Sequence, residues 1–164
     1  MNWSANEALR ELLEEKYLKY NRPDFIENDP VSLPHRFTRP GDMEVAGFFA
    51  ALLAWGQRKT IIAKCTELME RMDNAPHDFI VHAEGSDLRA LEGFRHRTFN
   101  DFDLLYIVAF LKGHYEKHPS LEAAFLEQHD PGSNVRANLT AFRNAFLAGA
   151  EGPVRTAKHI STPA

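Results

Sequence analysis

The chain has 164 residues, of which 44% are hydrophobic and 26% charged, a composition typical of one globular domain and unlike a disordered chain. Its formal net charge of −4 argues against a protein coated with basic residues for nucleic acid, although a local basic patch remains compatible with it. The longest apolar stretch, Val45 to Trp55, is too short for a bilayer, no export signal opens the chain, and the single Cys65 fits a reducing compartment. We therefore expect a cytoplasmic protein without membrane contact.

Helical periodicity dominates from the start, and residues 1–21 are predicted to form the first helix. Ser4 and Glu7 make a capping-box pattern, and an apolar stripe follows at one-face spacing, formed by Leu9, Leu12, Leu13 and Tyr17. Residues 22–41 contain four prolines, which fix φ and remove backbone donors. They predict an extended loop without a long regular element.

The helix Met43–Trp55 is apolar in every direction and follows Asp42, a good N-cap residue. A helix that is apolar all round is normally buried on all sides, so we place it at the centre of the core.

The remaining pattern predicts further helices within a helical core over 42–148, at Thr60–Met72, Pro76–Val81, Asp101–Lys117, Leu121–Gln128 and Val135–Leu147. Phe94–Asn100 is predicted to be a basic and aromatic loop, with Asn100 as the cap of the next helix. The period is lost over 149–164, which we interpret as an irregular tail. The prediction is one all-α domain over 1–164, with about seven helices and no strand pattern. The tail either packs back or marks a chain cut short, and we favour truncation.

Metal and nucleophile chemistry find little support in the sequence. His114 and His118 share a helix face at a spacing that can bind zinc, but no third ligand is evident, and a solvated helix end is the preferred interpretation. Cys65 lies on an apolar helix face, which predicts a buried and unreactive thiol. We expect no metal, no cofactor and no catalytic residue in this chain.

Positive charge is concentrated in four short windows without acids: His35, Arg36 and Arg39; Arg58, Lys59 and Lys64; Arg95, His96 and Arg97; and Arg155, Lys158 and His159. If these windows converge in the fold, they form a patch suited to phosphate. If they do not, they are ordinary solvated loop charges, and the sequence leaves both alternatives open.

Several segments resemble, in order, the signature of a bacterial family catalogued as a domain of unknown function. They are residues 46–58 (AGFFAALLAWGQR), 72–79 (MDNAPHDF), 94–99 (FRHRTF) and 158–161 (KHIS). The resemblance covers the chain from about Tyr20 to the end. It does not by itself imply a function.

A more distant similarity links the chain to the N-terminal half of helix-hairpin-helix DNA glycosylases of the endonuclease III-like group. Leu53–Gln57 resembles their leucine-serine-x-glutamine turn, which implies that Gln57 lies near the gap left by a flipped base. Leu91–Arg95 matches the beginning of their hairpin, but Arg95 replaces the second glycine. Where they place a catalytic aspartate, this chain reads Gly113–His118, so the hairpin, its lysine and the acid are not carried over.

Together these features favour a DNA-binding, glycosylase-like helical domain that lacks the catalytic hairpin and acid. The candidate DNA-binding residues are Gln57, Arg58, Lys59, Arg95, His96, Arg97, Lys158 and His159. We expect no catalysis from this chain alone, while a longer form as a glycosylase-like enzyme stays open. The alternative is a helical protein–protein interaction or scaffold module without a nucleic-acid role. The apolar stripe of the first helix also predicts that this helix either docks on a second copy, forming a homo-oligomer, or folds back in an altered position. The alternative is a first helix that packs normally on its own core.

Overall fold

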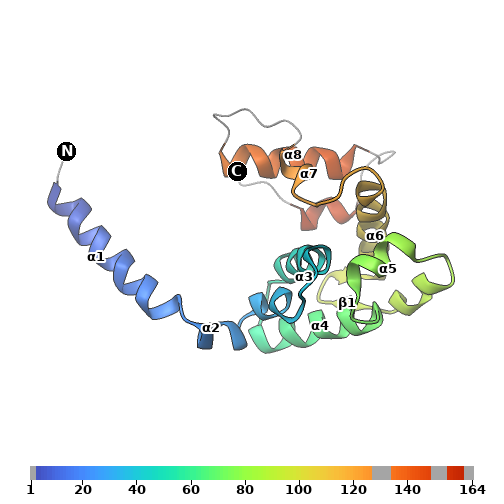
Figure 1. The fold of residues 1–164 in the computed structure, drawn as a ribbon, viewed down its shortest axis with the longest axis horizontal. Coiled ribbons are helices and arrows are strands. Elements are labelled where there is room, and N and C mark those ends of the chain that lie inside the picture. The colour runs from blue at the N-terminus through green and yellow to red at the C-terminus, as the bar shows by residue number, and fades with distance from the viewer. Residues whose placement is uncertain (1–2, 127–133, 149–154, 161–164) are drawn as a thin grey trace.

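The computed structural model describes residues 3–126, 134–148 and 155–160, and these residues are helical nearly throughout (Figure 1). The all-α class is confirmed. Within the described residues, β structure is limited to a hairpin in which β1 (Arg95–His96) pairs antiparallel with β2 (Phe99–Asn100). The sequence carries no strand pattern here because two-residue strands are too short to show alternation.

The body of the fold is built from short and medium helices joined by tight turns. They are α3 (Pro40–Leu52), α4 (Arg58–Arg71), α5 (Pro76–His82), the 3₁₀ turn η3 (Asp87–Leu91), α6 (Asp101–Tyr115), α7 (Ala123–Leu126), α8 (Val135–Leu147) and the 3₁₀ turn η4 (Arg155–His159). Helix α3 packs against α4 and α5, α6 packs against α5 and η4, and α7 packs against α8.

Two helices supply much of the core, rather than one. The buried apolar side chains of α3 are Val45, Ala46, Phe49 and Ala50, and those of α6 are Leu104, Ile107, Val108 and Leu111. Full burial of a large apolar side chain contributes about 1.5–3 kcal/mol, so both helices hold the body together.

Helix α3 differs from the prediction in position and in cover. It begins at Pro40 because a proline at the first helical position loses no needed donor, and Asp42, the expected N-cap, lies in the first turn, where Oδ1 accepts the backbone N–H of His77 at 3.0 Å. It is not covered on all sides, because Gly47 and Ala51 line an open groove of about 450 Å³. Small apolar residues such as Ala51 give the sequence of this helix an apolar pattern on every side, although they lie at the groove.

The proline-rich region folds into short helical turns instead of an extended loop. Helix α2 (Pro23–Glu27) and the 3₁₀ turns η1 (Pro30–Ser32) and η2 (Pro34–Arg36) each begin at a proline. As predicted, no long element forms here, because each further proline lacks the donor that continuation needs. The turns η1 and η2 pack against α3 and cover part of it.

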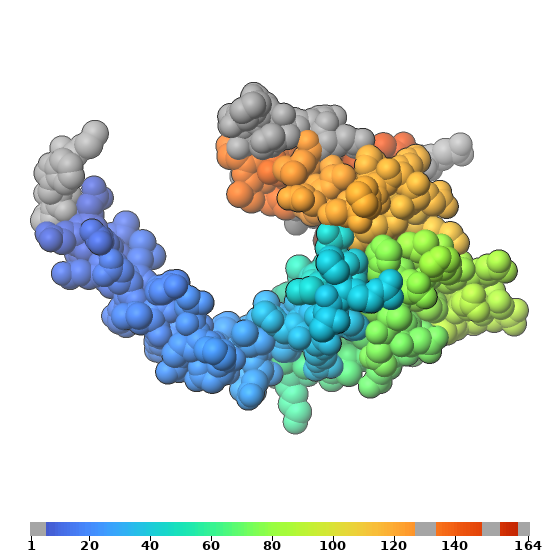
Figure 2. Space-filling view, viewed as in Figure 1, coloured from blue at the N-terminus to red at the C-terminus, as the bar shows by residue number. Residues whose placement is uncertain are grey.

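Helix α1 (Trp3–Tyr20) extends away from this body as a separate arm (Figures 1 and 2). Its predicted apolar stripe is present, but the side chains that form it are between 48% and 63% exposed: Leu9, Leu12, Leu13 and Tyr17. The described part of the chain therefore leaves this face uncovered.

Candidate functional site

Trp55 lies just after α3, at a point where three distant segments of the chain meet. The ring of His96 packs edge-on against it with centroids 5.6 Å apart, and the ring of His159 lies at 6.1 Å. The guanidinium of Arg97 lies over the indole at 5.3 Å from its centroid. We call the residues gathered here the Trp55 junction: Trp55, Gly56, His96, Arg97, Asp103, Arg155, Thr156 and His159.

The hairpin turn places Arg97 over the indole of Trp55, and Arg97 has an unusual backbone conformation. Arg97 has a φ of 55°, in the left-handed region that non-glycine residues seldom adopt. Gly56 faces it with a φ of 125°, and a Cβ added to Gly56 would lie 3.0 Å from Arg97 Nη1. The φ of Gly56 is therefore the reason glycine is favoured here, and a side chain at this position would also make the Arg97 guanidinium shift.

Asp103 is the buried acid that joins the C-terminal segment to the hairpin. The predicted cap is confirmed, since Asn100 Oδ1 accepts the Asp103 backbone N–H at 3.3 Å and Asp103 Oδ2 accepts the Asn100 N–H at 3.2 Å. Asp103 Oδ1 also accepts the Thr156 hydroxyl at 3.0 Å. The Nη2 of Arg155 lies 3.4 Å from Oδ2 and donates to the Thr98 carbonyl oxygen, also at 3.4 Å.

His159 completes the contact with Asp103. Its Nε2 lies 3.5 Å from Asp103 Oδ2, an ion-pair distance without a well-formed hydrogen bond. Burial lowers the pKa of His159 below its ordinary value, and the neighbouring Asp103 carboxylate opposes that shift. The neutral ring is thus favoured at pH 7, packed between Trp55 and Phe99.

The predicted DNA-binding residues fall into two groups. Six have exposed side chains: Gln57, Arg58, Lys59, Arg95, Arg97 and Lys158. His96 is only 2% exposed, with Nε2 3.3 Å from the Trp55 carbonyl oxygen, and the His159 side chain is 7% exposed. Both histidines are therefore placed to support the junction rather than to meet a ligand at its surface.

Only some of the basic windows converge. The residues that meet at the junction are Arg97, Arg155 and His159. Arg58 instead pairs with Asp29, with Nε 3.6 Å from Oδ2. Arg36 donates to the Thr66 hydroxyl at 2.9 Å on α4, while Arg39 pairs with Asp42 and Lys64 with Glu67. The loops thus supply one shared cluster and several ordinary surface charges.

Sequence reasoning missed Asp103 and Thr156 as members of the site. The spacing from Asn100 to Asp103 signals a capping box, which is the local role of Asp103. No local signal indicates that the same carboxylate also holds a hydroxyl 53 residues further along the chain.

A half-buried polar cluster is centred on Glu44. Its carboxylate accepts hydrogen bonds from the Tyr115 hydroxyl, from Ser120 Oγ and from the Leu121 N–H, at 3.1, 2.6 and 2.9 Å. Burial, reinforced by Glu44, raises the pKa of Tyr115. Each donor is matched to an oxygen, so the cluster fixes the turn before α7 and leaves no group free for chemistry.

The sequence also raised a zinc site at His114 and His118 and a reactive thiol at Cys65, and the structure gives neither further support. His114 Nε2 lies 2.9 Å from the Ser120 carbonyl oxygen, and within the described ranges no three His, Cys, Asp or Glu side chains are grouped to hold a metal ion. Cys65 is confirmed as buried, and burial raises the pKa of its thiol to about 12. Its lack of reactivity stays a prediction.

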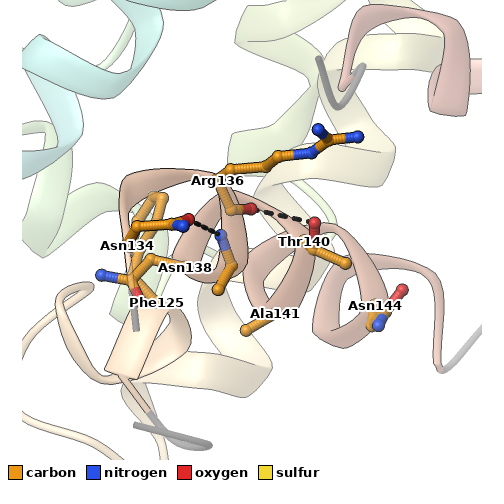
Figure 3. Close-up of a pocket in the computed structure, with 8 residues that line it drawn as sticks. Phe125, Asn134, Arg136, Asn138, Thr140, Ala141 and Asn144 are labelled. Carbon is orange, nitrogen blue, oxygen red and sulfur yellow. Dashed lines mark hydrogen bonds between the residues drawn. The ribbon is translucent and has the colours of Figure 1, made fainter. Parts of the chain in front are cut away.

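A groove between α7 and α8 is open but chemically plain (Figure 3). Two of its polar side chains bond to the helix itself: Asn134 Oδ1 accepts the Ala137 N–H at 3.1 Å, and the Thr140 hydroxyl donates to the Arg136 carbonyl oxygen at 2.9 Å. We therefore favour the Trp55 junction over this groove as the candidate binding site.

Comparison with known proteins identifies a family but not an activity. A family model described as "Protein of unknown function (DUF2400)" matches residues 29–164, which include the Trp55 junction and leave out α1. No curated protein and no solved structure matches the chain. None of the described helices is long and apolar enough to cross a membrane. The similarity to DNA glycosylases receives no support from these comparisons and stays a hypothesis. The resemblance to a domain of unknown function is confirmed, and the chain belongs to the DUF2400 family.

Proposed function

We propose that this chain is a DNA-binding helical domain that contacts phosphates through the exposed cations of the Trp55 junction. The observation that carries the proposal is the convergence of the hairpin and the C-terminal segment on Trp55. Arg97 and Arg155 come from windows more than fifty residues apart, and Lys158 is exposed on the same segment as Arg155. Phosphate contacts need cations of this kind, held by a scaffold that fixes their position.

The acids around these cations support the same conclusion. The carboxylate of Asp103 is fully buried, accepts hydrogen bonds from Thr156 and Asn100 and pairs with Arg155, so it repels an approaching phosphate less than an exposed, unpaired acid would. Asp101, which lies near the hairpin, accepts the Gly93 N–H at 2.8 Å. That hydrogen bond engages the N–H of Gly93, the one glycine within Leu91–Arg95. A contact through exposed side chains is therefore favoured over a helix-hairpin-helix contact at Leu91–Arg95.

Salt-dependent DNA affinity tests the proposal directly. Fluorescence anisotropy with a labelled duplex should give weak binding whose constant falls as salt rises from about 50 to about 200 mM, because bound counterions are released. Replacing Arg97 or Lys158 with Gln should each reduce the slope of log K against log salt by about one. Lys117→Gln is the matched control, since Lys117 is exposed beyond the other end of α6.

Two outcomes would contradict the proposal. One is the absence of binding at about 100 µM protein in low salt, where even non-specific DNA binders are retained. The other is an equal loss of affinity in Lys117→Gln, which would mean that net charge rather than the junction attracts DNA.

The glycosylase-like part of the proposal concerns Gln57. Its side chain is exposed at the N-cap of α4 without capping the helix. If Gln57 fills the gap left by a flipped base, Gln57→Ala should weaken binding to a duplex with an abasic site more than binding to an intact duplex. Equal effects on both would remove this assignment and leave phosphate binding standing.

We expect no base release by this chain alone, because the residues that resemble the hairpin and acid positions lack the lysine and the aspartate. Glycosylase chemistry needs such a nucleophile or carboxylate near the sugar. Borohydride trapping on damaged duplex DNA should give no covalent product, and a trapped complex would contradict the expectation.

A protein–protein interaction or scaffold module is the second candidate function, favoured by the exposed apolar face of α1. It predicts no salt-dependent DNA affinity and no effect of Arg97→Gln on partner binding. The anisotropy series therefore separates the two candidates.

A further inference from the structure

Helix α1 exposes a row of large apolar side chains. It has 18 residues, and helices in proteins take most of their stability from the packing of an apolar face. Leu9, Leu12 and Leu13 are each about half exposed, and Figure 2 shows the arm standing clear of the body. The face is thus both in need of cover and accessible to a neighbour.

The glutamates of α1 lie apart from its apolar face. At about 100° per residue, one side of the helix carries Leu9, Leu12, Leu13, Tyr17 and Tyr20, with Lys16 among them. The opposite side and its flanks carry Leu18 and the glutamates Glu7, Glu11, Glu14 and Glu15. Four glutamates against three cations make a poor match for an anionic membrane surface, which attracts helices with a basic polar face.

We propose that α1 is a dimerisation helix, whose apolar face pairs antiparallel with the same face of a second copy of the chain. A two-fold interface must be self-complementary, so each flank meets itself in reverse order. Arg10 and Glu14 lie on one flank, where Arg10 Nε donates to Glu14 Oε1 at 3.0 Å. A two-fold axis near Leu12 places Arg10 of each copy beside Glu14 of the partner subunit, with the leucines between them.

The area available fits a second copy of the same helix. Five large side chains, each about half exposed, offer roughly 500 Å² per copy, or roughly 1,000 Å² in the pair. That total lies at the lower end of specific interfaces and corresponds to a weak, reversible dimer. The arm is joined to the body through Asn21 and Arg22 and stands clear of it, which leaves the helix accessible to a second copy.

Sedimentation of the whole chain from about 1 to about 100 µM tests the pairing. The wild type should shift from monomer to dimer over this range. Leu13→Glu should raise the dimer dissociation constant at least tenfold. Leu18→Glu is the matched control, because Leu18 lies on the opposite side of the same helix, is 71% exposed, and should leave the dissociation constant unchanged.

Charge exchange tests the antiparallel register. Arg10→Glu and Glu14→Arg should each dimerise less well than the wild type, because like charges then meet across the interface. A mixture of the two variants should recover dimerisation, because the all-acidic flank of one variant then meets the all-basic flank of the other. Mixing leaves the sequence of each variant helix unchanged. Recovery in the mixture therefore cannot come from a change in helix stability.

Three results would overturn the proposal. The first is a wild type that stays monomeric at about 100 µM. The second is self-association that survives Leu13→Glu, which would place the interface elsewhere. The third is binding to phosphatidylglycerol vesicles that Leu13→Glu abolishes while no self-association is seen, which would assign the face to membranes instead. DNA affinity of the Leu13→Glu variant reports on the Trp55 junction separately.

Discussion

The two ends of the described chain are attached to the body in opposite ways. The C-terminal segment, residues 155–160, has only six described residues, yet Arg155, Thr156 and His159 all meet the buried carboxylate of Asp103. Helix α1 is three times as long and rich in leucine, and it stands away from the body. Apolar content therefore does not decide which segment docks.

What decides docking is a matching partner within the fold. A fully buried carboxylate without partners is costly, and the C-terminal segment supplies a hydroxyl and a guanidinium for it, with the His159 ring packed beside it. The leucines of α1 face none of the described residues in a comparable way. Polar contacts within the chain attach the C-terminal segment to the body. For α1, we have proposed contacts with a second copy of the chain.

The largest expected effect is that of removing the carboxylate that holds the C-terminal segment. Asp103→Ala should lower the free energy of unfolding by about 2–4 kcal/mol, because it leaves Thr156 and Arg155 without their partner and breaks the α6 cap. Urea denaturation measures the loss, and hydrogen exchange should rise over 155–160. Asn100→Ala removes the cap but not the contact with the segment, and should cost about 1 kcal/mol. Equal losses in both variants would mean that the segment is not held by Asp103.

Much of the fold could be predicted because it depends on neighbours in sequence. Val135–Leu147 and the Asn100 cap were both found as predicted, since periodicity and capping are local. Pro40 shows the limit of such reasoning: the helix begins at the proline, while Asp42 binds the N–H of His77, a partner 35 residues away.

The candidate site was harder to predict than the fold. Basic residues in loops suggested a patch, but the sequence does not show that His96 turns inward to the Trp55 carbonyl oxygen or that Arg58 turns toward Asp29. Those orientations depend on contacts between distant segments, which a single sequence does not reveal. The exposed stripe of α1 was predictable, and what covers it was not.

A smaller effect is expected where the hairpin meets Trp55. Gly56→Ala should destabilise the body by about 1–2 kcal/mol, because a φ of 125° strains any residue with a side chain and the new Cβ displaces Arg97. Gly85→Ala is the matched control, since a Cβ there has open space and the backbone is unstrained. Thermal unfolding of both variants compares them. If Gly56→Ala unfolds at the same temperature as Gly85→Ala, the contact between Gly56 and Arg97 is not tightly packed in solution.

The protonation of His159 should have a weaker effect on the same attachment. Its pKa in the folded chain lies below the ordinary value of 6.5, because burial disfavours the charged ring. The stability contributed by the neutral ring is therefore fully present above about pH 6.5 and is lost as the pH falls through the folded pKa. The charges that face the ring are those of Asp103, Arg155 and Lys158, and the carboxylate limits the loss.

His159→Gln isolates this contribution. The urea midpoint of the wild type should fall more steeply between about pH 7.5 and about pH 5 than that of the variant, because the variant has no ring to protonate. Identical pH profiles would show that the histidine ring is not buried in solution, and that the C-terminal segment is attached less firmly than the Asp103 contacts indicate.

The smallest effect is expected at the other end of the chain. Leu13→Ala should change the free energy of unfolding of the monomer by less than about 0.5 kcal/mol, because the side chain is 59% exposed and alanine favours helix. Leu33→Ala is the contrasting variant, since Leu33 is fully buried in the body and its truncation should cost about 2–5 kcal/mol. Urea denaturation at about 1 µM, where a weak dimer is dissociated, measures both. A loss above about 1.5 kcal/mol in Leu13→Ala at this concentration would mean that α1 packs on its own body, as the C-terminal segment does. The contrast between the two ends would then disappear, and with it the reason to assign the α1 face to a second copy.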